Sequence, residues 1–122
     1  MIGSYEMLIV DCPDPKALAR FYAELVGAEI VGWEDDWTEI ARTGDAHPLM
    51  AFQRVEGEYT PPEWPGQLVP QQMHIDVRVD DFDAAEEQVL AIGATDTGDK
   101  HAGYRVYLDP AGHPFCLIRP ND

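Results

Sequence analysis

The chain has 122 residues, 45% of them hydrophobic, and 23 acidic residues face eight basic ones, giving a formal net charge of −15. This length and apolar content suit one folded domain and exclude an intrinsically disordered chain. The excess negative charge disfavours binding to nucleic acids and to anionic membranes, and no apolar run approaches the roughly 20 residues of a membrane helix.

The two ends of the chain give simple expectations. The N-terminal sequence MIGSYEMLIVD has neither the basic start nor the cleavage pattern of a signal peptide, so we expect a cytoplasmic protein. Cys12 and Cys116 stand far apart in the sequence and do not form a disulfide framework. We therefore expect two free thiols.

The first half of the chain predicts a strand, a helix and three further strands. Residues 6–12 (EMLIVDC) are typical of a strand, and Asp14 and Pro15 suit the start of a helix that ends at Gly27. The three strands that follow are predicted over residues 29–33, 37–42 and 49–55. We place this first module at about residues 4–56.

A proline-rich stretch at about residues 57–71 predicts an extended connector, and the pattern then starts again. Residues 73–79 (MHIDVRV) alternate as a strand, and acids around Asp81 suit the start of a helix that ends at Gly93. Strands are predicted at 94–97, 104–108 and 115–119, with a tight turn at 109–112. The second module is thus placed at about residues 72–120.

Equivalent signals in the two halves keep a nearly constant separation. Met7 and His74 are 67 residues apart, as are Asp14 and Asp81, whereas His47 and His113 are 66 apart. We conclude that the chain contains two copies of one βαβββ unit.

The doubled module resembles the vicinal oxygen chelate superfamily, which includes glyoxalase I, extradiol dioxygenases, fosfomycin-modifying enzymes and bleomycin-resistance proteins. Residues 5–27 and 72–94 resemble its two opening strand–helix segments, and LDPAGHPFCLI (108–118) is similar to its closing turn and strand. The resemblance implies an α+β fold in which two tandem βαβββ modules form a curved mixed sheet around a central cavity. It also implies a homodimer, with the modules pairing within one chain or across a swapped dimer.

Metal-dependent members of this superfamily hold one divalent ion with residues of the first and last strands of each module. At the matching positions this chain has Met7, His74, Cys116 and one residue of the window 50–53. Only His74 is a usual ligand. Gln53 is the only oxygen donor in the window 50–53, whereas the 66-residue spacing of His47-Pro48 and His113-Pro114 would make Met50 the equivalent of Cys116. We therefore predict no conventional metal site and no cofactor. His47, His101 and His113 are interpreted as loop residues.

The remaining candidates are residues expected to line the cavity. They are His74, Cys116, Trp37, Phe52, Gln53, Trp64 and Tyr104. Aromatic side chains suit a flat or apolar ligand, although each of these also fits core packing, and Trp64 either fixes the connector or covers the cavity. Trp33 and Tyr107 are further aromatic candidates, and Glu39 is a candidate acid or base.

Three functions follow from these residues. The first is a metal-independent protein that binds an aromatic or apolar small molecule, by sequestration or sensing. The second is an enzyme of lyase, dioxygenase or thiol-transferase type, centred on His74 and Cys116, in which the histidine activates the thiol or a degenerate metal is used. The third is an accessory domain without a ligand.

Overall fold

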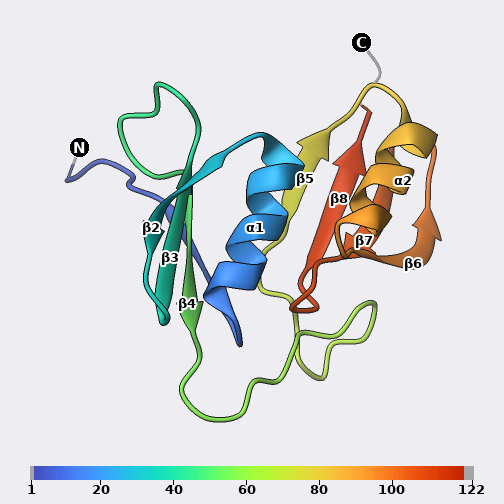
Figure 1. Cartoon of the computed structure of the whole chain (residues 1–122). Coiled ribbons are helices and arrows are strands. Elements are labelled where there is room, and N and C mark those ends of the chain that lie inside the picture. Colours follow the sequence, from blue (N-terminus) through green and yellow to red (C-terminus); the bar gives the residue numbers. More distant parts are fainter. Residues whose placement is uncertain (1, 120–122) are drawn as a thin grey trace. The chain divides into compact units, whose positions relative to one another are not determined.

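Each half of the chain forms one four-stranded sheet with one helix in the computed structural model, which describes residues 2–119 (Figure 1). The chain divides between Tyr59 and Thr60 into two units. The first holds β1 (Leu8–Cys12), α1 (Pro15–Val26), β2 (Glu29–Trp33), β3 (Trp37–Ala41) and β4 (Met50–Arg54). The second holds β5 (Ile75–Arg78), α2 (Phe82–Ala91), β6 (Thr95–Lys100), β7 (Tyr104–Leu108) and β8 (Pro114–Ile118). The predicted end of module two at residue 120 lies outside the described residues.

The two sheets have the same topology. Their strand orders are β1-β4-β3-β2 and β5-β8-β7-β6, and in each the first strand pairs in parallel with the last while the other pairs are antiparallel. These mixed, curved sheets confirm the predicted α+β fold of two βαβββ modules. The parallel pair requires a crossover connection, which each helix begins.

The repeat is also visible at the starts of the helices. The side chains of Asp14 and Asp81 are both N-caps, accepting hydrogen bonds from the backbone N–H of Ala17 at 3.2 Å and of Ala84 at 3.1 Å. Such a cap satisfies one of the backbone donors that a helix leaves unpaired at its start. The aspartates 67 residues apart in sequence therefore have the same structural role.

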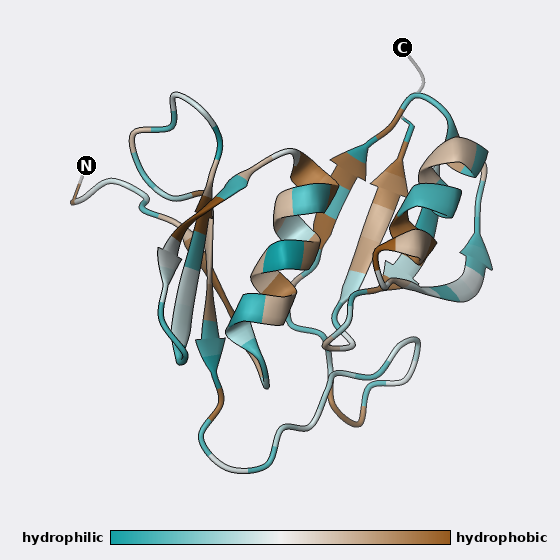
Figure 2. Cartoon of the chain, in the orientation of Figure 1, coloured by the Kyte–Doolittle hydropathy of each residue, from teal (hydrophilic) through white to brown (hydrophobic). Residues whose placement is uncertain are grey.

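The two helices are held by different means. Helix α1 buries Leu18, Phe21 and Tyr22 against its sheet, whereas α2 buries only Val89. Figure 2 shows that much of β5 and β8 consists of hydrophobic residues. Helix α2 also reaches its sheet through a polar contact, because the Tyr107 hydroxyl donates a hydrogen bond to Glu86.

Strand β6 differs from its prediction. It runs from Thr95 to Lys100 rather than over 94–97, and its register with β7 shifts between Asp96 and Lys100. Gly98 lies inside the irregular part with a φ of 79°, a conformation that glycine adopts without strain. The sequence TDTGDK hides this longer strand because a glycine and two aspartates interrupt the apolar alternation.

The proline-rich segment has no helix or strand, and from Thr60 on it belongs to the second unit. A Cβ atom added to Gly112 would lie 2.8 Å from Cβ of Pro61, so the connector is in close contact with the turn that follows β7. Within this turn, Oδ1 of the buried Asp109 accepts hydrogen bonds from the backbone N–H of Ala111 at 2.8 Å and of His113 at 3.0 Å. The turn at 109–112 is thereby confirmed.

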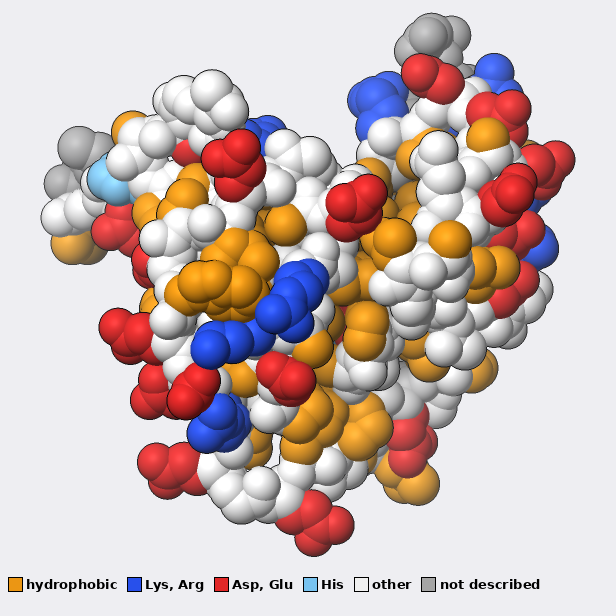
Figure 3. Space-filling view, viewed as in Figure 1, with side chains coloured by type: hydrophobic (Ala, Val, Ile, Leu, Met, Phe, Trp, Pro, Cys, Tyr) orange, Lys and Arg blue, Asp and Glu red, His pale blue; other side chains and the backbone are white. Residues whose placement is uncertain are grey.

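Basic and hydrophobic side chains lie together on part of the first unit. Figure 3 shows basic side chains beside hydrophobic ones over α1 and the neighbouring β2. There Lys16 and Arg20 lie over the half-exposed ring of Trp33, at 5.3 and 5.0 Å from its centroid. Within the described range, no helix has the length and hydropathy needed to cross a membrane.

Candidate functional site

The two faces of the second sheet have different neighbours. Tyr107 and Phe115 are paired in register on the face covered by α2, where the Tyr107 hydroxyl reaches Glu86. Side chains alternate along a strand, so the next residue on each strand points to the opposite face. We call this opposite side the distal face. From β5 across β8 to β7, one row of paired residues on the distal face is Asp76, Cys116 and Val106. The neighbouring row is Arg78, Ile118 and Tyr104.

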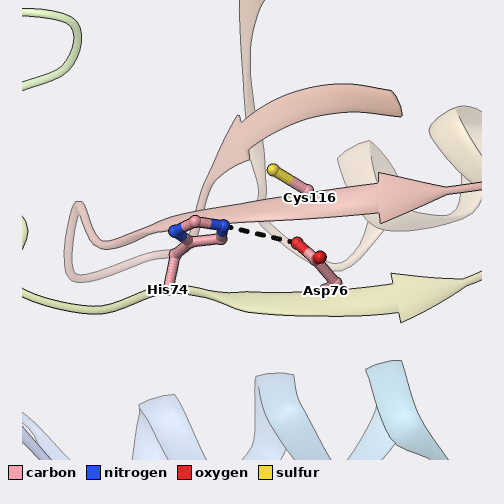
Figure 4. Close-up of side chains that lie close together, drawn as sticks. All are labelled: His74, Asp76 and Cys116. Carbon is pink, nitrogen blue, oxygen red and sulfur yellow. Dashed lines mark ion pairs between the residues drawn. The ribbon is translucent and has the colours of Figure 1, made fainter. Parts of the chain in front are cut away.

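Three polar side chains converge on the distal face (Figure 4). His74 directly precedes β5, Asp76 follows two residues later on the same side, and Cys116 is the partner of Asp76 in the ladder between β5 and β8. One ligand-type atom from each of these residues lies within 4.8 Å of the others. His74 Nε2 is 3.4 Å from Asp76 Oδ1, and both side chains are about half exposed while Cys116 is buried. We refer to this set as the 74/76/116 cluster.

Burial and the neighbouring carboxylate set the state of the Cys116 thiol. Loss of solvent on burial, together with the negative charge and hydrogen bonding of Asp76, raises the pKa of Cys116 to about 11. The thiol is therefore protonated at neutral pH. His74 is half exposed beside Asp76, and the cluster does not present the activated thiolate of a cysteine nucleophile.

We predict that Cys116 is alkylated slowly in the native protein. In a Cys12→Ser background with chelator present, its rate with iodoacetamide at pH 8 should lie about 100-fold below that of an unperturbed thiol, because the thiolate fraction falls about tenfold for each unit of pKa. Mass spectrometry over pH 7 to 11 should show the rate still rising above pH 9.

The same measurement separates the two carboxylates that contribute to this shift. Asp76→Asn should speed alkylation of Cys116 more than Asp99→Asn does, because Asp76 contributes more to the raised pKa. With Asp76 and Asp99 both intact, an alkylation rate that levels off near pH 9 would contradict the raised pKa of Cys116.

The first module has no comparable donors at the equivalent positions. Ile9 pairs with Ala51 just as Asp76 pairs with Cys116, so the fourth position of the superfamily's metal pattern is Ala51. Met50 instead pairs with Leu8 on the face toward α1. Met7 offers a thioether and Ala51 a methyl group, and neither suits the ions used by the superfamily. The residues present therefore do not fit a metal centre shared by the two modules.

The predicted aromatic residues divide between the two faces of their sheets. Trp37 and Gln53 are paired in register on the side of the first sheet that faces away from α1, and Tyr104 begins β7 as Trp37 begins β3. The Trp37 indole N–H donates to Glu39 Oε2 at 3.1 Å. Trp64 is half-buried on the connector. None of these positions tests whether the residues contact a ligand, so their role in ligand binding stays a prediction.

Three aromatic candidates lie on the helix sides of the sheets. Phe52 is fully buried and stacks on Tyr22 of α1 with ring centroids 5.5 Å apart. Trp33 lies under cations of α1, and the fully buried Tyr107 lies under α2. Their burial or exposure is explained by packing between sheet and helix.

Two residues of the distal face were not singled out from the sequence. Asp76 and Arg78 follow His74 at steps of two along MHIDVRV, so the alternation that places His74 also places them. By contrast, His47 and His101 lie in loops beside carboxylates, His47 at 2.7 Å from Glu6 and His101 at 2.6 Å from Asp99.

The sequence matches one family of known proteins, and the fold matches that of several solved structures. A family model described as glyoxalase-like domain matches residues 7–118, and no curated protein matches the sequence. Among solved structures, a glyoxalase-related enzyme from Fulvimarina pelagi has a TM-score of 0.66 at 18% identity, over 98% of this chain and 89% of that one.

Two antibiotic-related proteins share the fold. The fosfomycin resistance protein FosX from Mesorhizobium loti has a TM-score of 0.66 at 19% identity, over 99% of this chain and 94% of that one. The bleomycin-binding protein of Streptomyces verticillus, solved with copper(II)-bleomycin, has a TM-score of 0.57 at 21% identity, over 99% and 100% of the two chains. At these identities the likeness shows the fold and leaves function to the residues.

Proposed function

Because the chain belongs to the glyoxalase-like domain family of the vicinal oxygen chelate superfamily, we propose that it binds an aromatic or apolar small molecule on the distal face of its second sheet. The observation that carries the proposal is the mixture of side chains on that face. Cys116 and Val106 form an apolar centre, with Asp76 and Arg78 at one edge and Tyr104 at the other.

This combination is typical of sites for small organic ligands. Such sites have mainly apolar and aromatic linings, with a few polar groups that orient the ligand. Tyr104 is 40% exposed and stacks on His101 with ring centroids 4.3 Å apart, so its ring is held in place while one side remains available. A stacked aromatic ring on the ligand would extend this pair.

The structural relatives include both binding proteins and enzymes, and the state of Cys116 favours binding. A thiol transferase centred on Cys116 would need a thiolate near neutral pH, whereas burial and Asp76 raise the pKa of this thiol. Sequestration or sensing needs only a complementary surface. The acidic character of the chain would assist capture of a cationic ligand.

A thermal-shift screen of chelator-treated protein tests this function. The screen would contain planar aromatic antibiotics, metal-free bleomycin among them, and thiol adducts of dicarbonyl compounds. A true ligand at 100 times its Kd should stabilise the protein by about 2.7 kcal/mol and raise its Tm accordingly. We expect Tyr104→Ala to weaken binding of that ligand by about tenfold or more, measured by calorimetric titration.

Matched variants locate the binding surface. Tyr5→Ala removes a tyrosine that is 79% exposed outside the sheets and should leave the affinity unchanged. Trp37→Ala alters the equivalent position of the first sheet. A loss confined to Trp37→Ala would move the site to the first unit, and a screen without any stabilising compound would favour an accessory domain instead. Homodimer formation and cytoplasmic location remain predictions from the sequence.

A further inference from the structure

The 74/76/116 cluster contains three kinds of metal donor, namely an imidazole nitrogen, a carboxylate oxygen and a sulfur. All three come from adjacent strand segments of one unit, so their spacing is set by the β5–β8 ladder. Asp76 has no Lys or Arg within ion-pair distance among the described residues, and its one such neighbour is His74. The cluster thus combines three donor types with a carboxylate that has no Lys or Arg beside it in the described part of the chain.

We propose that the second unit by itself binds one Zn²⁺ through His74, Asp76 and Cys116. Zn²⁺ accepts nitrogen, oxygen and thiolate ligands in one tetrahedral shell, whereas Mg²⁺ and Ca²⁺ require oxygen ligands. The carboxylate and a thiolate together balance the two charges of the ion. Binding would displace the thiol proton of Cys116 to solvent, since a coordinating thiol is deprotonated.

One observed donor–donor distance already matches that of a tetrahedral site. Ligand bonds of 2.0 to 2.3 Å place donor atoms roughly 3.3 to 3.8 Å apart. The His74–Asp76 distance of 3.4 Å is already within this range, and the cluster as a whole lies within 4.8 Å. His74 and Asp76 are half exposed and free to make the remaining adjustment, while Cys116 supplies a fixed, buried anchor.

This site shares His74 and Cys116 with the ligand positions of the superfamily pattern but takes its third ligand, Asp76, from the same module. The shared centre needs donors from both modules, and Met7 and Ala51 supply none. Asp76 stands two residues beyond the usual first-strand position and provides the third ligand within module two. Three protein ligands leave the fourth tetrahedral position to water or to another small ligand.

Zinc titration of the tag-free, full-length protein tests the proposal. Calorimetry and elemental analysis after dialysis should find one Zn²⁺ per chain. Replacement of Zn²⁺ by Co²⁺ should produce a thiolate-to-cobalt charge-transfer band, which reports the sulfur ligand directly without any substitution. His74→Ala, Asp76→Asn and Cys116→Ser should each weaken zinc binding by about 100-fold or more, and Cys116→Ser should abolish the band.

Two control variants match the chemistry of the cluster. Cys12→Ser removes the other buried thiol, and His47→Ala removes a histidine that pairs with Glu6 at 2.7 Å in the first unit. Both should keep one Zn²⁺ and the cobalt band. The proposal is overturned if the unaltered chain binds no stoichiometric zinc, or if Cys116→Ser binds it as tightly as the unaltered chain. Because the ligand screen uses chelator-treated protein, it can succeed or fail independently.

Discussion

Replacing Gly112 by alanine is expected to destabilise the second unit by about 3 kcal/mol. Gly112 has a φ of 90°, where a residue with a Cβ atom is strained by about 1 to 2 kcal/mol. The added Cβ would also lie 2.8 Å from Cβ of Pro61, and overpacking of this kind costs about 1 to 3 kcal/mol. Urea unfolding followed by circular dichroism measures the loss.

Gly98→Ala is the matched control for this experiment. Gly98 has a φ of 79°, but an added Cβ would meet nothing within 4 Å, so this variant carries the backbone strain without the collision. It should lose only about 1 to 2 kcal/mol. In Gly112→Ala alone, amide hydrogen exchange should also increase in the connector around Pro61. Equal losses in the two variants would show that the connector does not restrain the turn.

The contact of Gly112 with Pro61 illustrates what the sequence could and could not provide. The Asp109–Gly112 turn was predictable because Asp, Pro and Gly have strong local preferences. The doubled module was predictable for a similar reason, since the caps Asp14 and Asp81 act on their own helices. That the connector packs on the turn is a long-range contact, and no local preference encodes it.

The same limit applies to the candidate site. Alternation places His74, Asp76 and Arg78 on one face of β5, so this part of the site could have been predicted in full. Assigning Ala51 rather than Met50 to the fourth ligand position required the observed pairing with Ile9. A shift of one residue in register reverses the face of every side chain on a strand. Because the loop before β4 and the loop before β8 differ in length, counting along the sequence does not fix this register.

Glu86 links α2 to its sheet through polar contacts. Its carboxylate accepts a hydrogen bond from the Tyr107 hydroxyl at 2.8 Å and pairs with Lys100 at 2.8 Å, with Arg105 further away at 3.7 Å. Burial and the nearby Glu86 raise the pKa of Tyr107 above its usual value, so the hydroxyl remains a donor. These polar contacts join α2 to its sheet, whereas Leu18, Phe21 and Tyr22 join α1 to its sheet by apolar packing.

We therefore expect Glu86→Ala to destabilise the protein by about 2 kcal/mol. The change leaves the hydroxyl of the fully buried Tyr107 without its acceptor, and an unsatisfied buried polar group costs about 1 to 3 kcal/mol. Tyr107→Phe should cost about 1 kcal/mol, because it removes the hydrogen bond together with the group that needs it. Urea denaturation of each variant gives these free energies of unfolding.

A double-mutant cycle then tests whether Glu86 and Tyr107 act as a pair. When Tyr107 lacks its hydroxyl, removing Glu86 no longer leaves a buried donor without an acceptor. The double variant should therefore lose about 1 kcal/mol less stability than the sum of the two single losses. Glu87→Ala, one residue along on the exposed side of α2, should change stability by less than about 0.5 kcal/mol. Strict additivity, or equal losses for Glu86→Ala and Glu87→Ala, would mean that the apolar contacts of Val89 hold α2 without this network.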